Sequence, residues 1–222
     1  MLESLVREGV VRGAALLAGG AGAAIFGEAF EETRDAEGRA LRAPLGGFAQ
    51  AHAEHNRTLA NHAVERVAPE GAHVLELFAG HGNFTLSIAQ RAQALTAVEL
   101  DADATRCLRE NLETHQLRAT VITSDSASAT HALPRGSVDA VLLDPPREGA
   151  RDAIAPLVAL APQRIVYVSC HPESLGRDAS MLVAGGYRLA SARAFDMFPQ
   201  TAHVEVVARF ERADARDRPK RA

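Results

Sequence analysis

From Gly47 onward, short apolar segments alternate with helical segments of about 10–15 residues. This alternation predicts crossover units, in which each helix connects two parallel strands of one sheet. The apolar segments contain few polar residues, as expected for strands that helices cover on both faces. We therefore expect an α/β fold with a Rossmann-like, doubly wound and mostly parallel sheet.

Five strands are expected at residues 73–78, 95–100, 119–125, 137–144 and 164–170. The helices beside them are expected at residues 49–68, 84–92, 104–115, 151–161 and 171–186. The last two strand segments, residues 187–198 and 203–210, follow each other without a helix. The sheet should therefore end in an antiparallel hairpin, an arrangement that resembles class I methyltransferases.

The main domain is expected at residues 48–210, and residues 211–222 read as a disordered polar tail. Residues 1–47 are rich in Gly and Ala and are only weakly patterned. Within them, residues 22–44 predict two short strands around a polar turn at residues 35–38. We interpret residues 1–47 as an irregular extension or the remnant of a β-rich domain.

Composition narrows the classes of function. The net charge of −4 and the isoelectric point near 6.1 are not typical of a non-specific nucleic-acid binder. Two cysteines, Cys107 and Cys170, are too few for a disulfide framework and indicate a reducing, cytoplasmic environment. Residues 10–26 look like a signal-peptide core, but Arg12 and several glycines interrupt it. We expect no membrane segment.

Acidic residues and glycines at strand ends predict a nucleotide-like cofactor. Gly80 and Gly82 lie in the turn after the first strand, where ligands of parallel sheets bind. Glu99 ends the next strand and can accept ribose hydroxyls. Asp125 ends the third strand and can face an adenine. A nicotinamide cofactor fits these residues almost equally, although Thr85 occupies the place of the usual third glycine.

Three later features indicate chemistry other than hydride transfer. Asp144 is followed by two prolines, which keep its backbone extended at the end of a strand. Cys170 lies between a strand and a helix, where a helix N-terminus can lower the pKa of a thiol. Glu205 stands on an otherwise apolar strand, so it needs a partner or a function. His203 is an alternative base on the same side of that strand.

The segments LELFAGHGNFTL, LLDPPREGA, VYVSCHPESLGRD and FDMFPQTAHVE, in this order, resemble the RNA uracil-C5 (5-methyluridine) methyltransferase family. The resemblance covers about residues 40–210. It implies S-adenosylmethionine as cofactor and Cys170 as nucleophile, with Glu205 as proton acceptor. The cofactor-contacting positions that it implies are Gln50, Phe78, Asn83, Glu99 and Asp144.

The resemblance also implies an RNA substrate, a uridine of tRNA or rRNA that forms a covalent adduct with the cysteine. Relatives usually carry an RNA-binding barrel and a complete central domain. Residues 1–47 look like the end of that central domain. His171 replaces the usual Asn beside the nucleophile, and His52 replaces an Asn in the Gln50 motif. His52, His55 and His62 share one predicted helix, but no acid or cysteine completes a metal site. We expect a monomer without metal.

Two other functions are compatible with the sequence. The Asp144-Pro145-Pro146 segment can hold an amino group in a methyltransferase for another substrate, which would not need Cys170. A cofactor-binding module that has lost turnover is the third possibility, although intact Cys170 and Glu205 speak against it. Arg216, Arg218, Lys220 and Arg221 in the tail can touch RNA, but a solvated tail is the simpler interpretation.

Overall fold

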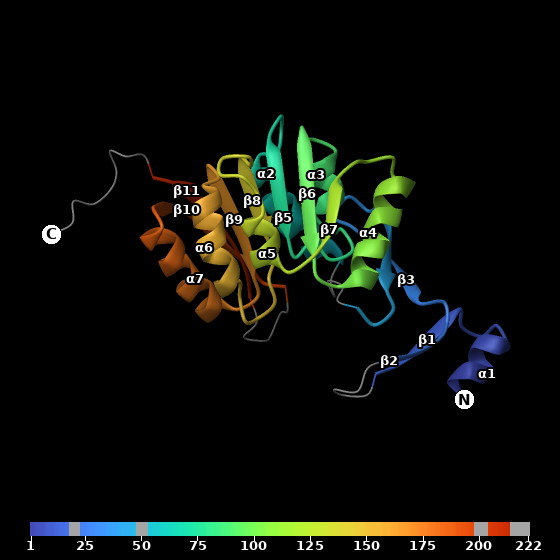
Figure 1. The fold of residues 1–222 in the computed structure, drawn as a ribbon. Helices are drawn as coiled ribbons and strands as arrows, with labels where there is room; N and C mark the ends of the chain where they lie inside the picture. The colour runs from blue at the N-terminus through green and yellow to red at the C-terminus, as the bar shows by residue number, and fades with distance from the viewer. Residues whose placement is uncertain (18–22, 48–52, 198–203, 214–222) are drawn as a thin grey trace.

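The computed structural model of the chain describes residues 1–17, 23–47, 53–197 and 204–213. Its centre is a seven-stranded sheet in the order β10-β11-β9-β8-β5-β6-β7 (Figure 1). Its strands are β5 (His73–Leu77), β6 (Ala94–Glu99), β7 (Thr120–Thr123), β8 (Ala140–Leu143), β9 (Arg164–Ser169), β10 (Tyr187–Phe195) and β11 (Glu205–Arg212). The first five are parallel, and β11 runs antiparallel to both β9 and β10. The predicted fold class and the closing hairpin are confirmed.

Helices cover both faces of this sheet (Figure 1). One layer consists of α5 (Ser126–His131), α6 (Arg151–Leu160) and α7 (Pro172–Ala184). The other consists of α2 (Ala53–Val67), α3 (Thr85–Ala89) and α4 (Ala102–Thr114). No helix within the described ranges combines the length and apolarity that crossing a bilayer requires.

Strand β5 shows how the sheet divides the core between these layers. Val74 packs into the cluster that contains the buried side of α2. Leu75 and Leu77, on the opposite side, pack with residues of α6 and α7. Alternate side chains of a strand point to opposite faces, so a strand between two helical layers is expected to be mostly apolar.

The N-terminal part forms two hairpins and a short helix. The predicted pair around residues 35–38 is present as β3 (Phe30–Arg34) and β4 (Ala40–Pro44), which lie against α4. A second pair, β1 (Gly13–Leu17) with β2 (Ala23–Gly27), and helix α1 (Leu2–Arg7) were not predicted. Figure 1 shows α1, β1 and β2 beyond α4, away from the sheet.

A carboxylic acid is buried within the central strand. Glu76 is fully buried in β5, and neither of its carboxylate oxygens has a hydrogen-bond partner among the described residues. Burial raises the pKa of Glu76 to about 8, because the charged form loses its solvation there. Folding therefore keeps a proton on Glu76 at neutral pH that the unfolded chain would release.

A second buried acid connects three parts of the chain. The Asp178 carboxylate in α7 accepts hydrogen bonds from the Tyr167 hydroxyl and the Ala150 backbone N–H, both at 2.8 Å. Arg177 pairs with the same carboxylate at 2.8 Å and also donates to the Glu148 carbonyl at 2.7 Å. This network fixes the loop between β8 and α6 against β9 and α7.

Replacing Tyr167 by Phe should lower the free energy of unfolding by about 1.5–3 kcal/mol, because its hydroxyl bonds to a charged carboxylate. Tyr187→Phe is a matched control, since that buried hydroxyl donates only to the neutral Pro162 carbonyl. The control should lose about 0.5–1.5 kcal/mol in urea denaturation. Equal losses for the two variants would show that Asp178 is not the centre of the network.

Glu76→Gln should flatten the pH dependence of stability. The unfolded chain releases the Glu76 proton near pH 4.5, whereas the folded chain keeps it up to about pH 8. The stability of the parent chain therefore falls as pH rises through this window. The parent slope should be steeper by up to about 1.4 kcal/mol per pH unit. Urea denaturation at several pH values measures both slopes, and parallel curves would contradict the shifted pKa.

Candidate active site

A cavity of about 670 Å³ opens where the parallel strands end. Each of five strands contributes a side chain from its carboxyl end or the next residues, and β11 contributes its first residue. The residues that line the cavity are Phe78, Glu99, Leu100, Asp125, Ser126, Asp144, Pro145, Pro146, Arg147, Cys170 and Glu205. Six of the predicted site residues are thereby brought together: Phe78, Glu99, Asp125, Asp144, Cys170 and Glu205.

The turn after β5 has an unusual backbone. Phe78 has a φ of 60°, which is rare for a bulky residue, and Gly80 and Gly82 have φ values of 57° and 112°. A Cβ on Gly82 would lie 2.8 Å from the Leu108 side chain. Gly82 therefore allows close packing of the turn on α4, whereas Phe78 lines the cavity itself.

Glu99 is oriented by two backbone groups. Its Oε2 accepts a hydrogen bond from the Gly80 N–H at 2.9 Å, and its Oε1 accepts one from the Asp101 N–H at 2.8 Å. Each carboxylate oxygen can accept more than one hydrogen bond, so both remain able to accept hydroxyl donors. The acid is thus held at the cavity wall in a fixed orientation, as a diol-binding residue requires.

Two other predicted cofactor residues have structural partners. Asn83 forms a reciprocal pair with Asn56 of α2, with distances of 2.8 and 3.1 Å. Asp125 caps α5, accepting from the Ser128 N–H at 2.8 Å, and this bond lowers the pKa of the Asp125 carboxyl. Asp125 lines the cavity, whereas Asn83, Gly80 and Gly82 do not form its wall.

Strand register brings Cys170 and Glu205 together. Cys170 directly follows β9, and Val206 of β11 is paired with Ser169, the last residue of β9. Because β11 is antiparallel to β9, its first residue, Glu205, lies at the same edge of the sheet as Cys170. The sequence places these residues 35 positions apart, and the antiparallel return of the chain makes them neighbours.

Burial raises the pKa of two carboxyl groups and one thiol that line the cavity. Burial raises the pKa of Glu205 to about 7, and burial together with the Glu205 charge raises that of Asp144 to about 7. The pKa of the Cys170 thiol is also raised, first by burial and then by Glu205 and Asp144. The lowered thiol pKa expected from the helix N-terminus is therefore wrong, because burial and the nearby acids raise it instead.

His171 acts as the N-cap of α7. Its Nδ1 accepts a hydrogen bond from the Ser174 N–H at 3.3 Å. A side chain that accepts this N–H does what Asn does at a helix start, so the cap survives the replacement of the family's usual Asn. An imidazole that accepts through Nδ1 carries no proton there, so it cannot at the same time offer Nδ1–H to the thiolate.

Several predicted residues lie outside the described part of the chain. They are Gln50, His52, His203, Arg216, Arg218, Lys220 and Arg221. Of the three histidines considered for a metal, His55 and His62 lie in α2. The described ranges contain no group of three His, Cys, Asp or Glu side chains placed to hold a metal ion.

Part of the cavity wall was not predicted from the sequence. Leu100, Ser126 and Arg147 line the cavity although none was singled out. Each lies within one or three residues of a predicted site residue, so the strand-end position was the available signal. Glu76 was also missed, although an acid inside the apolar segment HVLELF carries the same signal that identified Glu205.

Comparisons with known proteins agree with this arrangement. The family model for tRNA (Uracil-5-)-methyltransferase matches residues 28–213. A 23S rRNA (uracil(1939)-C(5))-methyltransferase from Alkalilimnicola ehrlichii is 44% identical over 174 residues, 75% of this chain and 39% of the relative. Its counterpart from Stenotrophomonas maltophilia is 45% identical over 172 residues, which are 74% of this chain and 38% of the length of that relative. The chain thus spans about two fifths of the length of these relatives.

A solved structure gives the same result. The tRNA (uracil-54, C5)-methyltransferase of Pyrococcus abyssi, in complex with S-adenosyl-L-homocysteine, superposes with a TM-score of 0.72 at 30% identity. The match covers 84% of this chain and 45% of the archaeal protein. With its sheet order, its strand-end cavity and these sequence matches, the chain belongs to the tRNA (uracil-5-)-methyltransferase family.

Proposed function

We propose that the chain transfers a methyl group from S-adenosylmethionine to C5 of a uridine in RNA. The observation that carries this proposal is the single cavity that contains both a diol-binding acid, Glu99, and the pair Cys170 and Glu205. The names of the relatives, which are RNA uracil-C5 methyltransferases, support the same reaction. The two rRNA methyltransferases are 44% and 45% identical to this chain, whereas the tRNA methyltransferase is 30% identical. We therefore choose rRNA as the first substrate to test.

The cavity fits the cofactor at one end. Glu99, fixed by the Gly80 and Asp101 N–H groups, is suited to accept the two ribose hydroxyls. Phe78 and Leu100 offer apolar surface beside it, and Asp125 adds an acceptor for an adenine amino group. We therefore assign Glu99, Phe78 and Asp125 to cofactor binding, with Asp144 between this end and Cys170.

The other end of the cavity supplies the covalent chemistry. Uracil C5 is a poor nucleophile, and addition of the Cys170 Sγ to C6 converts the ring into an enolate with electron density at C5. S-adenosylmethionine, when bound, would supply the electrophilic methyl group that C5 accepts, and its S–CH3 bond would break to leave S-adenosyl-L-homocysteine. Glu205 then takes the C5 proton, the C6–Sγ bond breaks, and the thiolate is restored.

The pKa of Glu205 suits this role. At about 7 it is divided between its two forms near neutral pH, so it can accept a proton and return it to water in each cycle. The raised pKa of Cys170 means that its thiol must lose a proton before it can attack C6.

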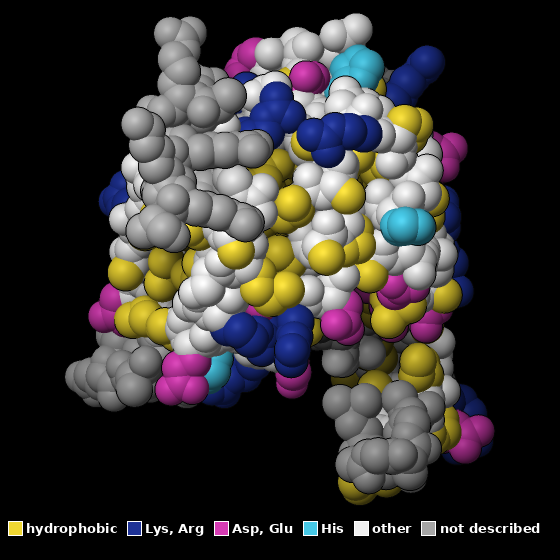
Figure 2. All heavy atoms as spheres, turned by 60° about the vertical axis from the view of Figure 1, so that its left-hand side comes forward, with side chains coloured by type: hydrophobic (Ala, Val, Ile, Leu, Met, Phe, Trp, Pro, Cys, Tyr) yellow, Lys and Arg dark blue, Asp and Glu magenta, His cyan; other side chains and the backbone are white. Residues whose placement is uncertain are grey.

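RNA capture is expected to be weak. The net charge is −4, and on the face drawn in Figure 2 basic side chains form small groups separated by hydrophobic and acidic ones. Few phosphate contacts give modest affinity with a shallow salt dependence. Selection of the uridine would then rest on turning the base out of its stack into the cavity.

The domain limits at residues 48 and 210, the monomeric state and the cytoplasmic location remain predictions.

Glu99→Ala should weaken binding of S-adenosyl-L-homocysteine by about 1–3 kcal/mol, because the ribose hydroxyls lose a charged acceptor. Isothermal titration measures this directly. Asp103→Ala is a suitable control, since this acid lies on the exposed side of α4 and pairs with Arg106 at 3.0 Å. Undiminished affinity of the Glu99 variant would remove Glu99 from the cofactor site.

Cys170→Ala should abolish methyl transfer to rRNA while S-adenosyl-L-homocysteine still binds. Glu205→Gln should instead accumulate a covalent protein–RNA adduct, because the ring can be attacked and methylated but cannot lose its C5 proton. A denaturing gel with labelled RNA should show this adduct, and the double variant with Cys170→Ala should lack it.

Persistent activity of Cys170→Ala would favour a methyltransferase for another kind of substrate. A folded Glu205→Gln variant that binds RNA and turns over without an adduct would point to His203 as the base. Cofactor binding without any methylation of rRNA or tRNA would indicate a module that lacks turnover.

A further inference from the structure

We propose that Asn111 is a positioning residue, which fixes the glycine turn of the cofactor site by tying it to the β3–β4 hairpin. This inference rests on the proposed function, because the turn matters only if it shapes the cofactor end of the cavity. Asn111 lies on α4, outside that cavity, and nothing in the family motifs singles it out.

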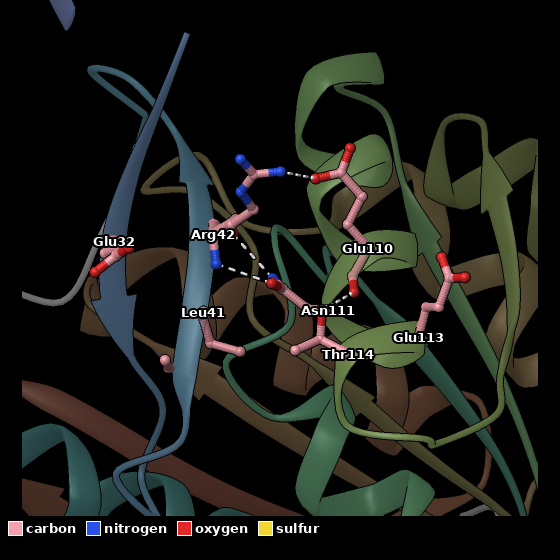
Figure 3. Close-up of a pocket in the computed structure, with 8 residues that line it drawn as sticks. Glu32, Leu41, Arg42, Glu110, Asn111, Glu113 and Thr114 are labelled. Carbon is pink, nitrogen blue, oxygen red and sulfur yellow. Dashed lines mark hydrogen bonds and ion pairs between the residues drawn. The ribbon is translucent and has the colours of Figure 1, made fainter. Parts of the chain in front are cut away.

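Asn111 is bonded to two segments far from it in sequence, the segments of Arg42 and His81. Figure 3 shows its bonds to Arg42. Its Oδ1 accepts from the Arg42 backbone N–H at 2.8 Å, and its Nδ2 donates to the Arg42 carbonyl at 2.9 Å. The same Nδ2 donates to the His81 carbonyl at 2.8 Å. The side chain is only 2% exposed, and both of its N–H donors are used.

The bond to His81 controls one peptide unit of the turn. The His81 carbonyl and the Gly82 N–H belong to the same peptide plane, and the Gly82 N–H donates to the Ala79 carbonyl at 3.1 Å. With Asn111 holding the carbonyl, the plane is fixed at both ends. Glycines on either side of His81 can rotate freely, so the plane has little other restraint against reorientation.

The same turn is held from the cavity side by Glu99, whose Oε2 accepts from the Gly80 N–H. Asn111 and Glu99 therefore hold adjacent residues of the turn from opposite sides. A change in the His81–Gly82 plane would shift Gly80, and with it the carboxylate that we assign to the ribose. Loss of Asn111 should thus reach the cofactor without any direct contact.

The hairpin is a firm anchor for Asn111. Leu41 of β4 is 1% exposed and packs with Ala79 of the turn and Leu86 and Leu108 of the flanking helices. At its other end, Arg39 pairs with Asp35 at 2.6 Å and donates to the Ser87 hydroxyl at 2.8 Å. The β3–β4 hairpin is therefore attached to both α3 and α4.

Asn111→Asp is the sharpest test, because it keeps the shape and the acceptor for the Arg42 N–H but loses both donors. Isothermal titration with S-adenosyl-L-homocysteine should show about tenfold weaker binding. Hydrogen exchange in residues 78–83 should be faster in the variant. Asn111→Ala, which removes all three bonds, should show at least the same loss at a temperature where circular dichroism finds it folded.

Glu110→Ala is the matched control, since Glu110, the residue before Asn111, ties α4 to the hairpin through an ion pair with Arg42 at 2.8 Å. This exposed pair does not involve the turn, so the control should bind within about twofold of the parent. Equal weakening by Glu110→Ala would assign the effect to loosening of the hairpin in general and overturn the role of Asn111.

The parent chain separates this inference from the proposed function. A parent that does not bind S-adenosyl-L-homocysteine would overturn the proposed cofactor, and the inference with it. A parent that binds, with an Asn111→Asp variant of unchanged affinity and unchanged exchange, would overturn the inference alone.

Discussion

The parallel pairing of β5, β6, β8 and β9 is the constraint on which the rest of the molecule depends. Helices cover both faces, so these strands are mostly apolar apart from their ends, and Glu76 within β5 is an exception. Parallel strands also end at one common edge, which gathers the terminal polar residues of each into one cavity. The reversed strand β11 adds Glu205 to that edge, because its first residue meets the end of β9.

Carboxyl groups in and behind this cavity make the fold less stable than it could be at neutral pH. Glu76, Asp144 and Glu205 all have raised pKa values because burial disfavours their charged forms. Such groups are typical of functional sites, where stability is given up for reactivity. The Asp178 network counteracts this locally, since it uses a fully buried, paired carboxylate to hold the loop that carries Asp144.

The sequence predicted the sheet, its closing hairpin and the strand-end positions of Glu99, Asp144 and Cys170 from local patterns. Glu205 was predicted inside the strand segment 203–210, whereas it is the first residue of β11. It did not predict α5, because the segment SASATH consists of small polar residues without helical periodicity. The direction of the Cys170 pKa was also wrong, since it depends on acids that only the folded sheet brings close. Asn111 was missed for the same reason, because its partners are 30 and 69 residues away.

The strand order has a consequence for assembly during synthesis. β11 lies between β9 and β10, although it is made after both. Until the last strand inserts, β9 is an open sheet edge with unpaired backbone groups, and Cys170 stands at that edge without its acid partner. A nascent chain that stops short of residue 205 thus contains Phe78, Glu99 and Asp125 but lacks Glu205, the base that we propose. The part of the cavity around Glu99 can therefore form before the part in which Glu205 lies beside Cys170.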